Sequence, residues 1–307
     1  IAIRRPMKTP EAGTEVFAPA QAGGTGVEPQ YPTSFPVDMA IRLYTPGLAS
    51  MPRLASRLTG ARYLKTSSSD AEVSDSNSTW DYMDGWFGSD TTAADNYGLM
   101  FKRATGFFDV VAYTGTGAVR TIPHNLGVAP EMMLFKIRNQ VSNWQVYASG
   151  MGPTKSNRLN NNGAPVTATA FFNDTAPTSS VFTVGTSGNV NWSGNTVIAY
   201  LFATLAGVSK VGSYTGTGSN VDVDCGFSAG ARFILIKRTD STGDWYVWDS
   251  VRGIVAGNDP YLLLNSSAAE VTSTDYIDPL ASGFTVTSSA PAALNASGGT
   301  YIFLAIS

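Results

Sequence analysis

A repeated pentapeptide constrains the fold of this chain more than any other feature. The string YTGTG occurs at residues 113–117 and again at residues 214–218, an offset of 101 residues. The same offset separates two further pairs, Lys136 from Lys237 and Trp144 from Trp245. Because each period of a repeat forms one structural unit, the chain should contain copies of a unit of about 100 residues.

A third, fainter copy precedes these two. Residues 63–73 align with residues 261–271, and the strand-like run 39–43 aligns with 133–137. We therefore expect three repeats, at residues 6–105, 106–206 and 207–307. Residues 1–5 resemble the end of a closing strand followed by a basic linker, and no initiator Met is present, so we expect them to be the end of an upstream repeat.

Each repeat has the sequence pattern of an all-β unit. Runs of β-branched and aromatic residues, such as 108–113 and 197–202, lie between clusters of Gly, Asn, Asp, Pro and Ser, which is typical of strands joined by tight turns. We predict an all-β fold of three tandem β-sandwich repeats, jelly-roll or immunoglobulin-like, each with its own core. Two segments differ. We expect a short helix within residues 48–58, limited by Pro52. Residues 5–36, which are rich in Pro and Gly, should form an extended N-terminal arm or a poorly packed first strand that lies over a neighbour.

The composition excludes several classes of function. Only 14% of the residues are charged and the net charge is −3, so the chain offers no basic surface for a nucleic-acid backbone. No run of about 18 apolar residues indicates a membrane span. One Cys and one His, Cys225 and His124, exclude an intrachain disulfide and a Cys/His zinc site. We expect no cofactor, no nucleic-acid partner and no membrane partner.

The chain's one imidazole and one thiol are poor candidates for a catalytic pair. His124 lies in a turn, and Cys225 occupies the matching position one repeat later. Matching positions in consecutive units lie in different places, so we interpret the two residues as a turn imidazole and a small apolar thiol.

Close pairs of carboxylates are the other candidates for acid–base or metal chemistry. They are Asp81 with Asp84, Asp222 with Asp224, Asp240 with Asp244, and Asp275 with Asp278. The second pair would share one strand face, but the preceding repeat has no acidic residue at the matching positions. The third pair fits a hairpin turn. We predict no catalytic residue, no metal site and no enzymatic activity, and we leave the ligand-binding residues unassigned.

Aromatic residues are the best candidates for recognition. Trp144 and Tyr147, like Trp245 and Trp248, are three residues apart, which places the two on opposite faces of a strand; we favour core packing for both pairs. Four aromatics near turns, Trp80, Trp86, Phe87 and Trp192, are better candidates for an exposed surface. Four basic residues, Lys136, Arg138, Lys237 and Arg238, end a strand in each copy, where we expect charges that prevent edge pairing.

Four strings together resemble a repeated domain of tailed bacteriophages. They are FFDVVAYTGTG, HNLGVAPEMMLFKIRN, NDTAPTSSVFTVGTSGNVNWSGNTVIAYLFA and NASGGTYIFLAIS. The domain they resemble is found in tail-fibre-like virion proteins, and its functional residues are not established. The resemblance therefore implies a virion structural protein and assigns no site residue.

The function expected from this resemblance is that of a tail fibre or receptor-binding appendage, assembled in the host cytoplasm and located in the virion. Its expected partners are other tail or baseplate proteins, further copies of itself, with a trimer as one arrangement, and a glycan or protein of the host surface. Two alternatives stay open. One is a phage-borne protein that binds or degrades polysaccharide, and the other is a capsid decoration protein.

Overall fold

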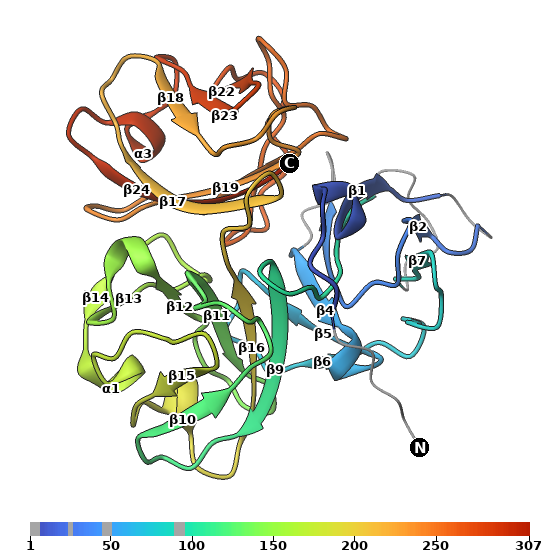
Figure 1. The fold of residues 1–307 in the computed structure, drawn as a ribbon, viewed down its shortest axis with the longest axis vertical. Coiled ribbons are helices and arrows are strands. Elements are labelled where there is room, and N and C mark those ends of the chain that lie inside the picture. The colour runs from blue at the N-terminus through green and yellow to red at the C-terminus, as the bar shows by residue number, and fades with distance from the viewer. Residues whose placement is uncertain (1–6, 24–26, 45–50, 89–95) are drawn as a thin grey trace.

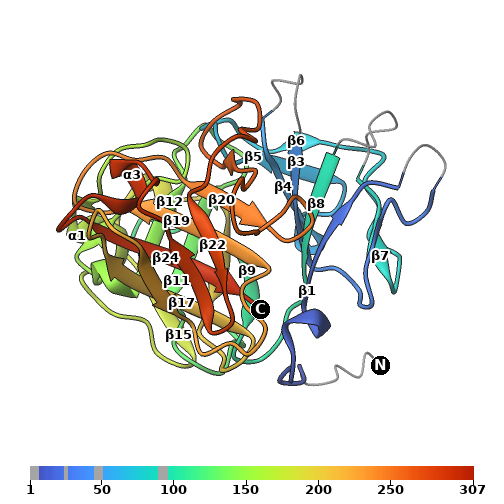
Figure 2. The ribbon, with the colours of Figure 1, turned by 90° about the horizontal axis from the view of Figure 1, so that it is seen from above.

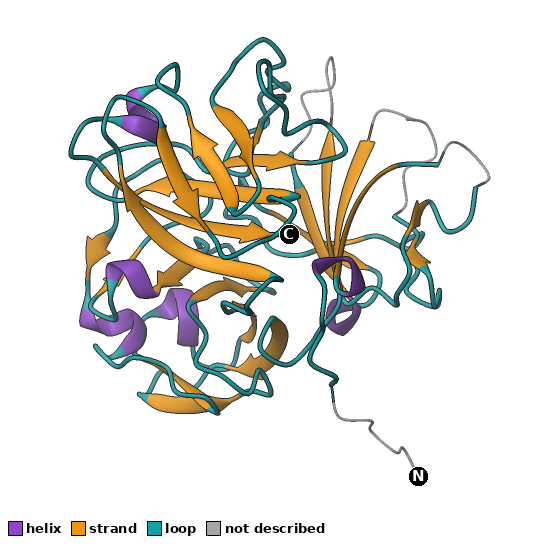
Figure 3. Ribbon diagram, turned by 45° about the horizontal axis from the view of Figure 1, so that its top comes forward, coloured by secondary structure: helices purple, strands orange, loops and turns teal. Residues whose placement is uncertain are grey.

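The computed structural model describes residues 7–23, 27–44, 51–88 and 96–307, and it is mostly β (Figures 1 and 3). Within these ranges the helical segments have three or four residues each, and no helix is long and apolar enough to cross a membrane. The prediction of an all-β chain is confirmed in this sense. The helical segments are η1 (Gly13–Glu15), η2 (Arg57–Thr59), η3 (Ser149–Met151), α1 (Thr169–Phe172), α2 (Gly188–Asn191) and α3 (Ala292–Asn295).

Three large antiparallel sheets share one order of strands. The first sheet contains, in spatial order, β1 (Phe17–Gln21), β8 (Asn96–Phe101), β3 (Met39–Tyr44), β4 (Arg53–Ser56), β5 (Arg62–Lys65) and β6 (Val73–Ser74). The second contains β9 (Phe108–Thr114), β16 (Thr196–Phe202), β11 (Met132–Ile137) and β12 (Gln145–Ala148). The third contains β17 (Ser209–Thr215), β24 (Thr300–Ile306), β19 (Phe233–Arg238), β20 (Tyr246–Asp249) and β21 (Leu262–Leu263).

The hydrogen-bonding register makes the three sheets comparable residue by residue. Met132 pairs with Phe202 on one side, and Phe233 pairs with Ile306 in the same way, with offsets of 101 residues between the first members and 104 between the second. Met39 pairs with Phe101. Met39 therefore corresponds to Met132, and the alignment predicted from the sequence for residues 39–43 was wrong by one position. Because side chains alternate between faces, such a shift would exchange the two faces of the strand.

Smaller sheets cover the outer faces of the three large ones. They comprise β2 (Tyr31–Pro32) with β7 (Gly85–Trp86); β10 (Arg120–Pro123) with β15 (Val181–Val184); and β18 (Val221–Asp224) with β23 (Gly283–Val286) and β22 (Ile277–Leu280). A further pair, β13 (Lys155–Ser156) with β14 (Val166–Thr167), lies beside β12 at the edge of the second sheet. The central strands of the large sheets, among them β3, β11, β16, β19 and β24, are thus buried on both faces. This explains why their sequences are continuous apolar runs and not alternating ones.

The three large sheets bury their inner faces in one shared core. On β11, Met132 and Leu134 belong to this core, whereas Met133 and Phe135 belong to an outer cluster under β10 and β15. At the centre, the ring of Phe101 lies 5.0, 5.8, 5.9 and 6.0 Å from the rings of Phe17, Phe108, Phe202 and Phe233, measured between centroids. Each repeat has its own outer cluster, as expected, but the additional core shared by the three sheets was not predicted.

Figures 1 and 2 show the resulting arrangement, in which the three large sheets surround the shared core. The sequence repeat determines the strands of each unit. It does not determine what covers the inner face of each large sheet. Here the neighbouring sheets cover it.

Two local expectations also differ from the structure. In the segment 48–58, residues 51–58 contain β4 and η2, while residues 45–50 lie outside the described residues. Leu54 faces the shared core and Ala55 faces an outer cluster, so the apolar residues alternate as in a strand. In the predicted arm, β1 pairs with β8 and buries Phe17 completely. The predicted upstream strand at residues 1–5 lies outside the described residues.

Candidate functional site

The single imidazole and the single thiol are both buried and contact other parts of the chain. Only 7% of His124 is exposed; its Nε2 lies 3.1 Å from the carbonyl oxygen of Thr178, and its Nδ1 accepts the Leu126 amide. Cys225 is buried, and burial raises the pKa of its thiol to about 12. Such a thiol is neutral at physiological pH and weakly nucleophilic. Both interpretations drawn from the sequence are confirmed.

The predicted carboxylate pairs do not form a common site. Asp222 and Asp224 share an exposed face of β18, but Asp222 accepts the Thr285 hydroxyl and Asp224 accepts the Gly226 amide. Asp240 binds Arg238, whereas Asp244 accepts the Asn265 side chain. Within the described ranges, no group of three or more acidic, His or Cys side chains could hold a metal ion.

Sequence reasoning missed the carboxylates that are most deeply buried. Asp109 accepts the amides of Val110 and Asn125 and forms an ion pair with Arg103. Asp249 binds Arg252, whose side chain is 1% exposed. Asp259 accepts three backbone amides, and its burial raises the pKa of the carboxyl to about 6. Each is held by its own loop or by a neighbouring Arg. Single acidic residues within or near apolar runs were the sequence signal for them.

The aromatic predictions divide into confirmed and wrong ones. Trp144 and Trp245 are buried in the shared core, and Tyr147 and Trp248 are buried in outer clusters. Of the aromatics predicted to be exposed, Trp192 is 46% exposed, but Trp80 and Trp86 are buried. Trp86 stacks on Tyr31 with 5.3 Å between ring centroids. The N-terminal Trp residues fill the outer cluster because this region has little other apolar bulk to cover the first sheet.

Two lysines predicted as edge charges lie in the interior. Lys136 and Lys237 are fully buried. Lys136 Nζ donates to the Ser69 carbonyl at 3.3 Å, and Lys237 Nζ donates to the Asn162 carbonyl at 3.1 Å. Each therefore binds the backbone of a neighbouring sheet's loop. Burial lowers the pKa of each lysine to about 8.

These contacts define two junctions between the sheets. Loop A (residues 65–72) follows β5, loop B (residues 158–165) follows β13, and loop C (residues 263–270) includes the end of β21. The first junction lies between loop A and the second sheet, and the second junction lies between loop B and the third sheet. At both, a Trp indole also donates at 2.9 Å to the start of the loop, from Trp144 to Lys65 and from Trp245 to Arg158.

At the first junction the remaining space is closed by an ion triad. Glu72 of loop A binds Arg138 of the second sheet at 2.8 Å and Arg62 of its own sheet at 3.3 Å. The Glu72 amide also donates to the Arg138 carbonyl. Only 11% of the Glu72 side chain and 17% of the Arg138 side chain are exposed. Arg138 therefore joins two sheets, and the prediction that it prevents pairing at a sheet edge was wrong.

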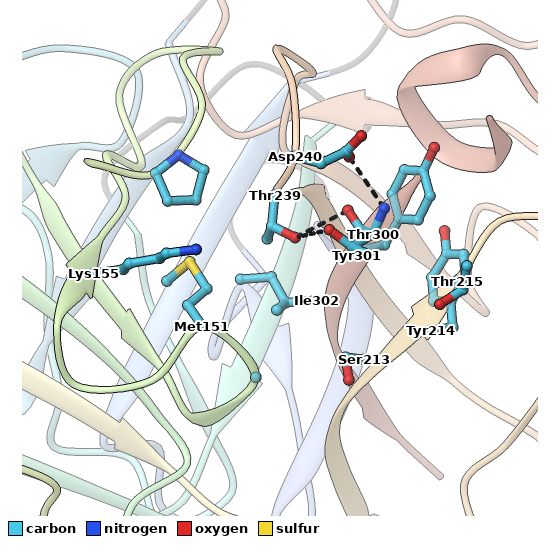
Figure 4. Close-up of a pocket in the computed structure, with 12 residues that line it drawn as sticks. Met151, Lys155, Ser213, Tyr214, Thr215, Thr239, Asp240, Thr300, Tyr301 and Ile302 are labelled. Atoms are coloured by element: carbon cyan, nitrogen blue, oxygen red, sulfur yellow. Dashed lines mark hydrogen bonds between the residues drawn. The ribbon is translucent and has the colours of Figure 1, made fainter. Parts of the chain in front are cut away.

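At the second junction the corresponding space is an open cleft (Figure 4). Its volume is about 460 Å³. One wall comes from the second sheet's side of the junction and the other from the third sheet. The lining residues are Gly150, Met151, Lys155, Pro165, Ser213, Tyr214, Thr215, Thr239, Asp240, Thr300, Tyr301 and Ile302.

The cleft is rich in hydroxyl groups and carries one unpaired positive charge. Lys155 is exposed and has no ion-pair partner among the described residues. Opposite it, Asp240 binds Arg238 through both carboxylate oxygens at 2.9 Å, which lowers the pKa of that carboxyl to about 2. Because this pair is neutral overall, Lys155 sets the charge of the cleft.

Aromatic side chains support the floor of the cleft. Tyr214 and Tyr301 stack with 4.8 Å between their ring centroids. Their hydroxyls donate to the Leu294 and Ala292 carbonyls, so the phenols are already bonded within the protein. The cleft was not predicted from the sequence. A complete alignment of the first and second copies would have shown Pro165 where Glu72 stands, and that was the available signal.

Comparison with protein families matches residues 59–307 to the family described as Domain of unknown function (DUF7483). The match covers most of the chain, and the chain therefore belongs to this family. No curated protein matches the sequence.

Proposed function

We propose that this member of the DUF7483 family is a non-catalytic structural protein of a tailed-bacteriophage virion, serving as a tail fibre or receptor-binding appendage. In this proposal three tandem β-sandwich modules are locked together around the shared core. Its support comes from the four strings that resemble repeats of tail-fibre-like virion proteins. Further support comes from the buried lysine and tryptophan side chains that join neighbouring sheets by hydrogen bonds.

One observation carries the structural part of the proposal. At both junctions a fully buried lysine and a buried tryptophan of one sheet bind backbone carbonyls of the next sheet's loop. Burying an ammonium group is costly, and it is offset by hydrogen bonds to carbonyl oxygens. The same arrangement at two junctions favours a rigid protein. An appendage that attaches a virion to its host needs such rigidity.

The partners in this proposal are other tail or baseplate proteins and further copies of the chain, with a trimer as one arrangement. The chain would be assembled in the host cytoplasm and carried in the virion, and it would contact a glycan or protein of the host surface. Trp192, 46% exposed at the end of the second sheet's module, is a candidate contact residue for such a surface.

Of the alternatives, carbohydrate binding is favoured by a specific observation, the hydroxyl-lined cleft at the second junction. It is compatible with a receptor-binding appendage. Polysaccharide degradation would need a pair of carboxylates about 5 to 10 Å apart in a groove. In the cleft, Asp240 is the acidic lining residue, and it is paired with Arg238.

The test is to locate the chain on intact particles. Antibodies raised against residues 106–307 and labelled with gold should mark the tail or its fibres in electron micrographs. Purified protein should bind whole host cells without lowering the viscosity of their polysaccharide or releasing reducing ends. Label on the head would instead support capsid decoration, loss of polysaccharide length would support an enzyme, and absence from particles would overturn the proposal.

A further inference from the structure

The two junctions can be aligned residue by residue, because loops A and B meet the next sheet through matching contacts. The carbonyls of Lys65 and Arg158 accept hydrogen bonds from the Trp indole N–H groups. The carbonyls of Ser69 and Asn162 accept hydrogen bonds from the lysine ammonium groups. Both pairs are 93 residues apart. The same offset relates Arg62 to Lys155 and Glu72 to Pro165. Arg62 and Lys155 begin β5 and β13, and Glu72 and Pro165 directly precede the strands paired with them, β6 and β14.

This alignment shows what the second junction lacks. At the first junction, the carboxylate of Glu72 lies between Arg62 and Arg138. At the second, Lys155 keeps the positive charge of Arg62, Thr239 replaces Arg138, and Pro165 replaces Glu72. A cationic wall and a hydrogen-bonding wall therefore remain, without the carboxylate that joins them at the other junction.

We propose that the second-junction cleft binds an acidic saccharide, whose carboxylate takes the place that Glu72 holds at the first junction. Figure 4 shows Lys155 extending from one wall toward Thr239 on the other. A ligand carboxylate between them would receive a charge-assisted hydrogen bond from the Lys155 ammonium. It would receive a second hydrogen bond from the Thr300 hydroxyl, because the Thr239 hydroxyl already donates to the Thr300 carbonyl at 3.0 Å.

The rest of the lining fits the hydroxyls and apolar ring face of a sugar. Ser213, Thr215 and Thr300 are exposed residues that can each donate and accept hydrogen bonds. The half-buried Met151 provides apolar surface beside them, and the buried Ile302 lies beneath it. The volume of about 460 Å³ lies within the range of small-molecule sites, about 300–1,000 Å³. It admits one or two sugar units, with the rest of a chain extending into solvent.

The charge balance selects an anionic ligand over a neutral one. Asp240 would repel a carboxylate if it were free, but Arg238 neutralises it through two hydrogen bonds of 2.9 Å. Lys155 is then the unbalanced charge at the cleft. The biological source of the saccharide, a host-surface polysaccharide, rests on the proposed attachment function, whereas binding itself does not.

The test uses the full chain and trigalacturonic acid as the probe, with affinity measured by isothermal titration calorimetry. The fully methyl-esterified trisaccharide is the neutral control, and sodium acetate is the control for a carboxylate without hydroxyls. We expect the acid to bind at least tenfold more tightly than either. Equal binding of acid and ester would overturn the role of the carboxylate, and equal binding of acetate would overturn the saccharide.

Two variants place the binding in the cleft. Lys155→Gln should weaken binding of the acid about five- to tenfold and leave the ester unchanged. The double variant Pro165→Glu with Thr239→Arg rebuilds the ion triad of the first junction and should abolish binding while keeping or raising the melting temperature. Lys210→Gln, on β17 outside the cleft, is the matched control and should bind normally.

The outcomes separate this inference from the proposed function. Failure of the folded wild-type chain to bind the acid, or an unchanged affinity in the double variant, would overturn the inference even if the protein is found on virions. Binding that responds to Lys155→Gln and to the double variant would support the inference even if gold labelling fails to find the chain on particles.

Discussion

The two junctions share a backbone frame and differ in three side chains. Both have a buried lysine, a buried tryptophan and a loop that offers its carbonyl oxygens. The first is closed by Arg62, Glu72 and Arg138, and the second is an open cleft lined by Lys155, Pro165 and Thr239. The buried lysine and tryptophan contacts therefore hold the sheets together at both junctions. The three side chains nearer the surface determine whether an ion triad fills the junction or a cleft remains.

Loop C lies where the third sheet contacts the first, and its contacts differ from those at the two junctions. It repeats the sequence features of loop A, yet its Glu270 binds Arg252 of its own sheet and not an arginine of the next sheet. Leu43 stands in the first sheet at the position of the two lysines and is part of the shared core. A hydrogen bond of 2.6 Å from Thr66 Oγ1 to the Leu264 carbonyl joins the two sheets here.

The largest expected effect is the loss of a junction tryptophan. Trp144→Ala and Trp245→Ala should each lower the free energy of unfolding by about 3 to 5 kcal/mol, because a fully buried indole is removed from a packed core. Urea unfolding followed by circular dichroism measures this. Since the core is shared, we expect one cooperative transition in both variants. A second transition, in which one sheet unfolds alone, would show that the modules are energetically independent.

The lysines should make stability increase with pH. The pKa of Lys136 and Lys237 is lowered to about 8 by burial, against the weaker opposing effects of Asp70 and Asp244. Between about pH 8 and pH 10.4, the unfolded chain binds more protons at these sites than the folded chain, so the free energy of unfolding rises with pH. Each lysine should contribute about 1 to 2 kcal/mol between pH 7 and pH 9.5.

This pH dependence is measured by urea unfolding at fixed ionic strength. Lys136→Met or Lys237→Met should each remove about half of the rise, and the double variant should flatten it. The measurement uses a Cys225→Ala background, because burial raises the pKa of this thiol to about 12, and its ionisation in the unfolded chain above about pH 8.5 would lower the free energy of unfolding. The range stops at pH 9.5 because burial also raises the pKa of several tyrosines, including Tyr200 and Tyr246. Stability that stays constant or falls between pH 7 and pH 9.5 would contradict the buried state of the two ammonium groups.

A smaller effect is expected from opening the first junction. Glu72→Gln should cost about 1 kcal/mol, since the ion pair with Arg138 is largely buried while the one with Arg62 is half exposed and weak. The matched control is Glu270→Gln in loop C, which should cost less because Arg252 keeps its bond to Asp249. Thermal melts at low and high salt give both values. A larger loss for Glu270→Gln would reverse the comparison.

The smallest effect on stability is expected at Trp192. Its side chain is 46% exposed, and Ala296 stands at the matching position of the third sheet's module. Trp192→Ala should therefore change the free energy of unfolding by less than about 0.5 kcal/mol. If Trp192 contacts the host, the same variant should lose cell attachment in a pull-down with whole cells. Attachment equal to that of the wild type would remove it as a contact residue.

Much of the local structure could be predicted from the sequence. The repeated strings placed the strands of the second and third sheets, and the spacing of Trp144 and Tyr147 predicted opposite, buried faces. The turn interpretation of His124 followed from its neighbours. The first sheet was harder, because its alignment with the other two depends on single residues such as Met39, and an error of one position exchanges the faces of a strand.

The candidate cleft could not be predicted in the same way. Its residues come from two sheets, and nothing near Lys155 in the sequence indicates that Thr239 faces it. Lys136 and Lys237 likewise looked like solvent-exposed charges at strand ends, because their carbonyl partners lie 67 and 75 residues away. Polar contacts over such separations carry no local pattern.

The sequence by itself determined the all-β character of the chain, its period of about 100 residues, and the opposite faces on which Trp144 and Tyr147, and Trp245 and Trp248, are buried. These follow from side-chain alternation and turn chemistry, which act over a few residues. Only the tertiary structure decided that the inner faces share one core and that one junction is sealed and the other open. Those outcomes depend on which distant surface covers each face, and burial of apolar area has no directional preference that a single strand could encode.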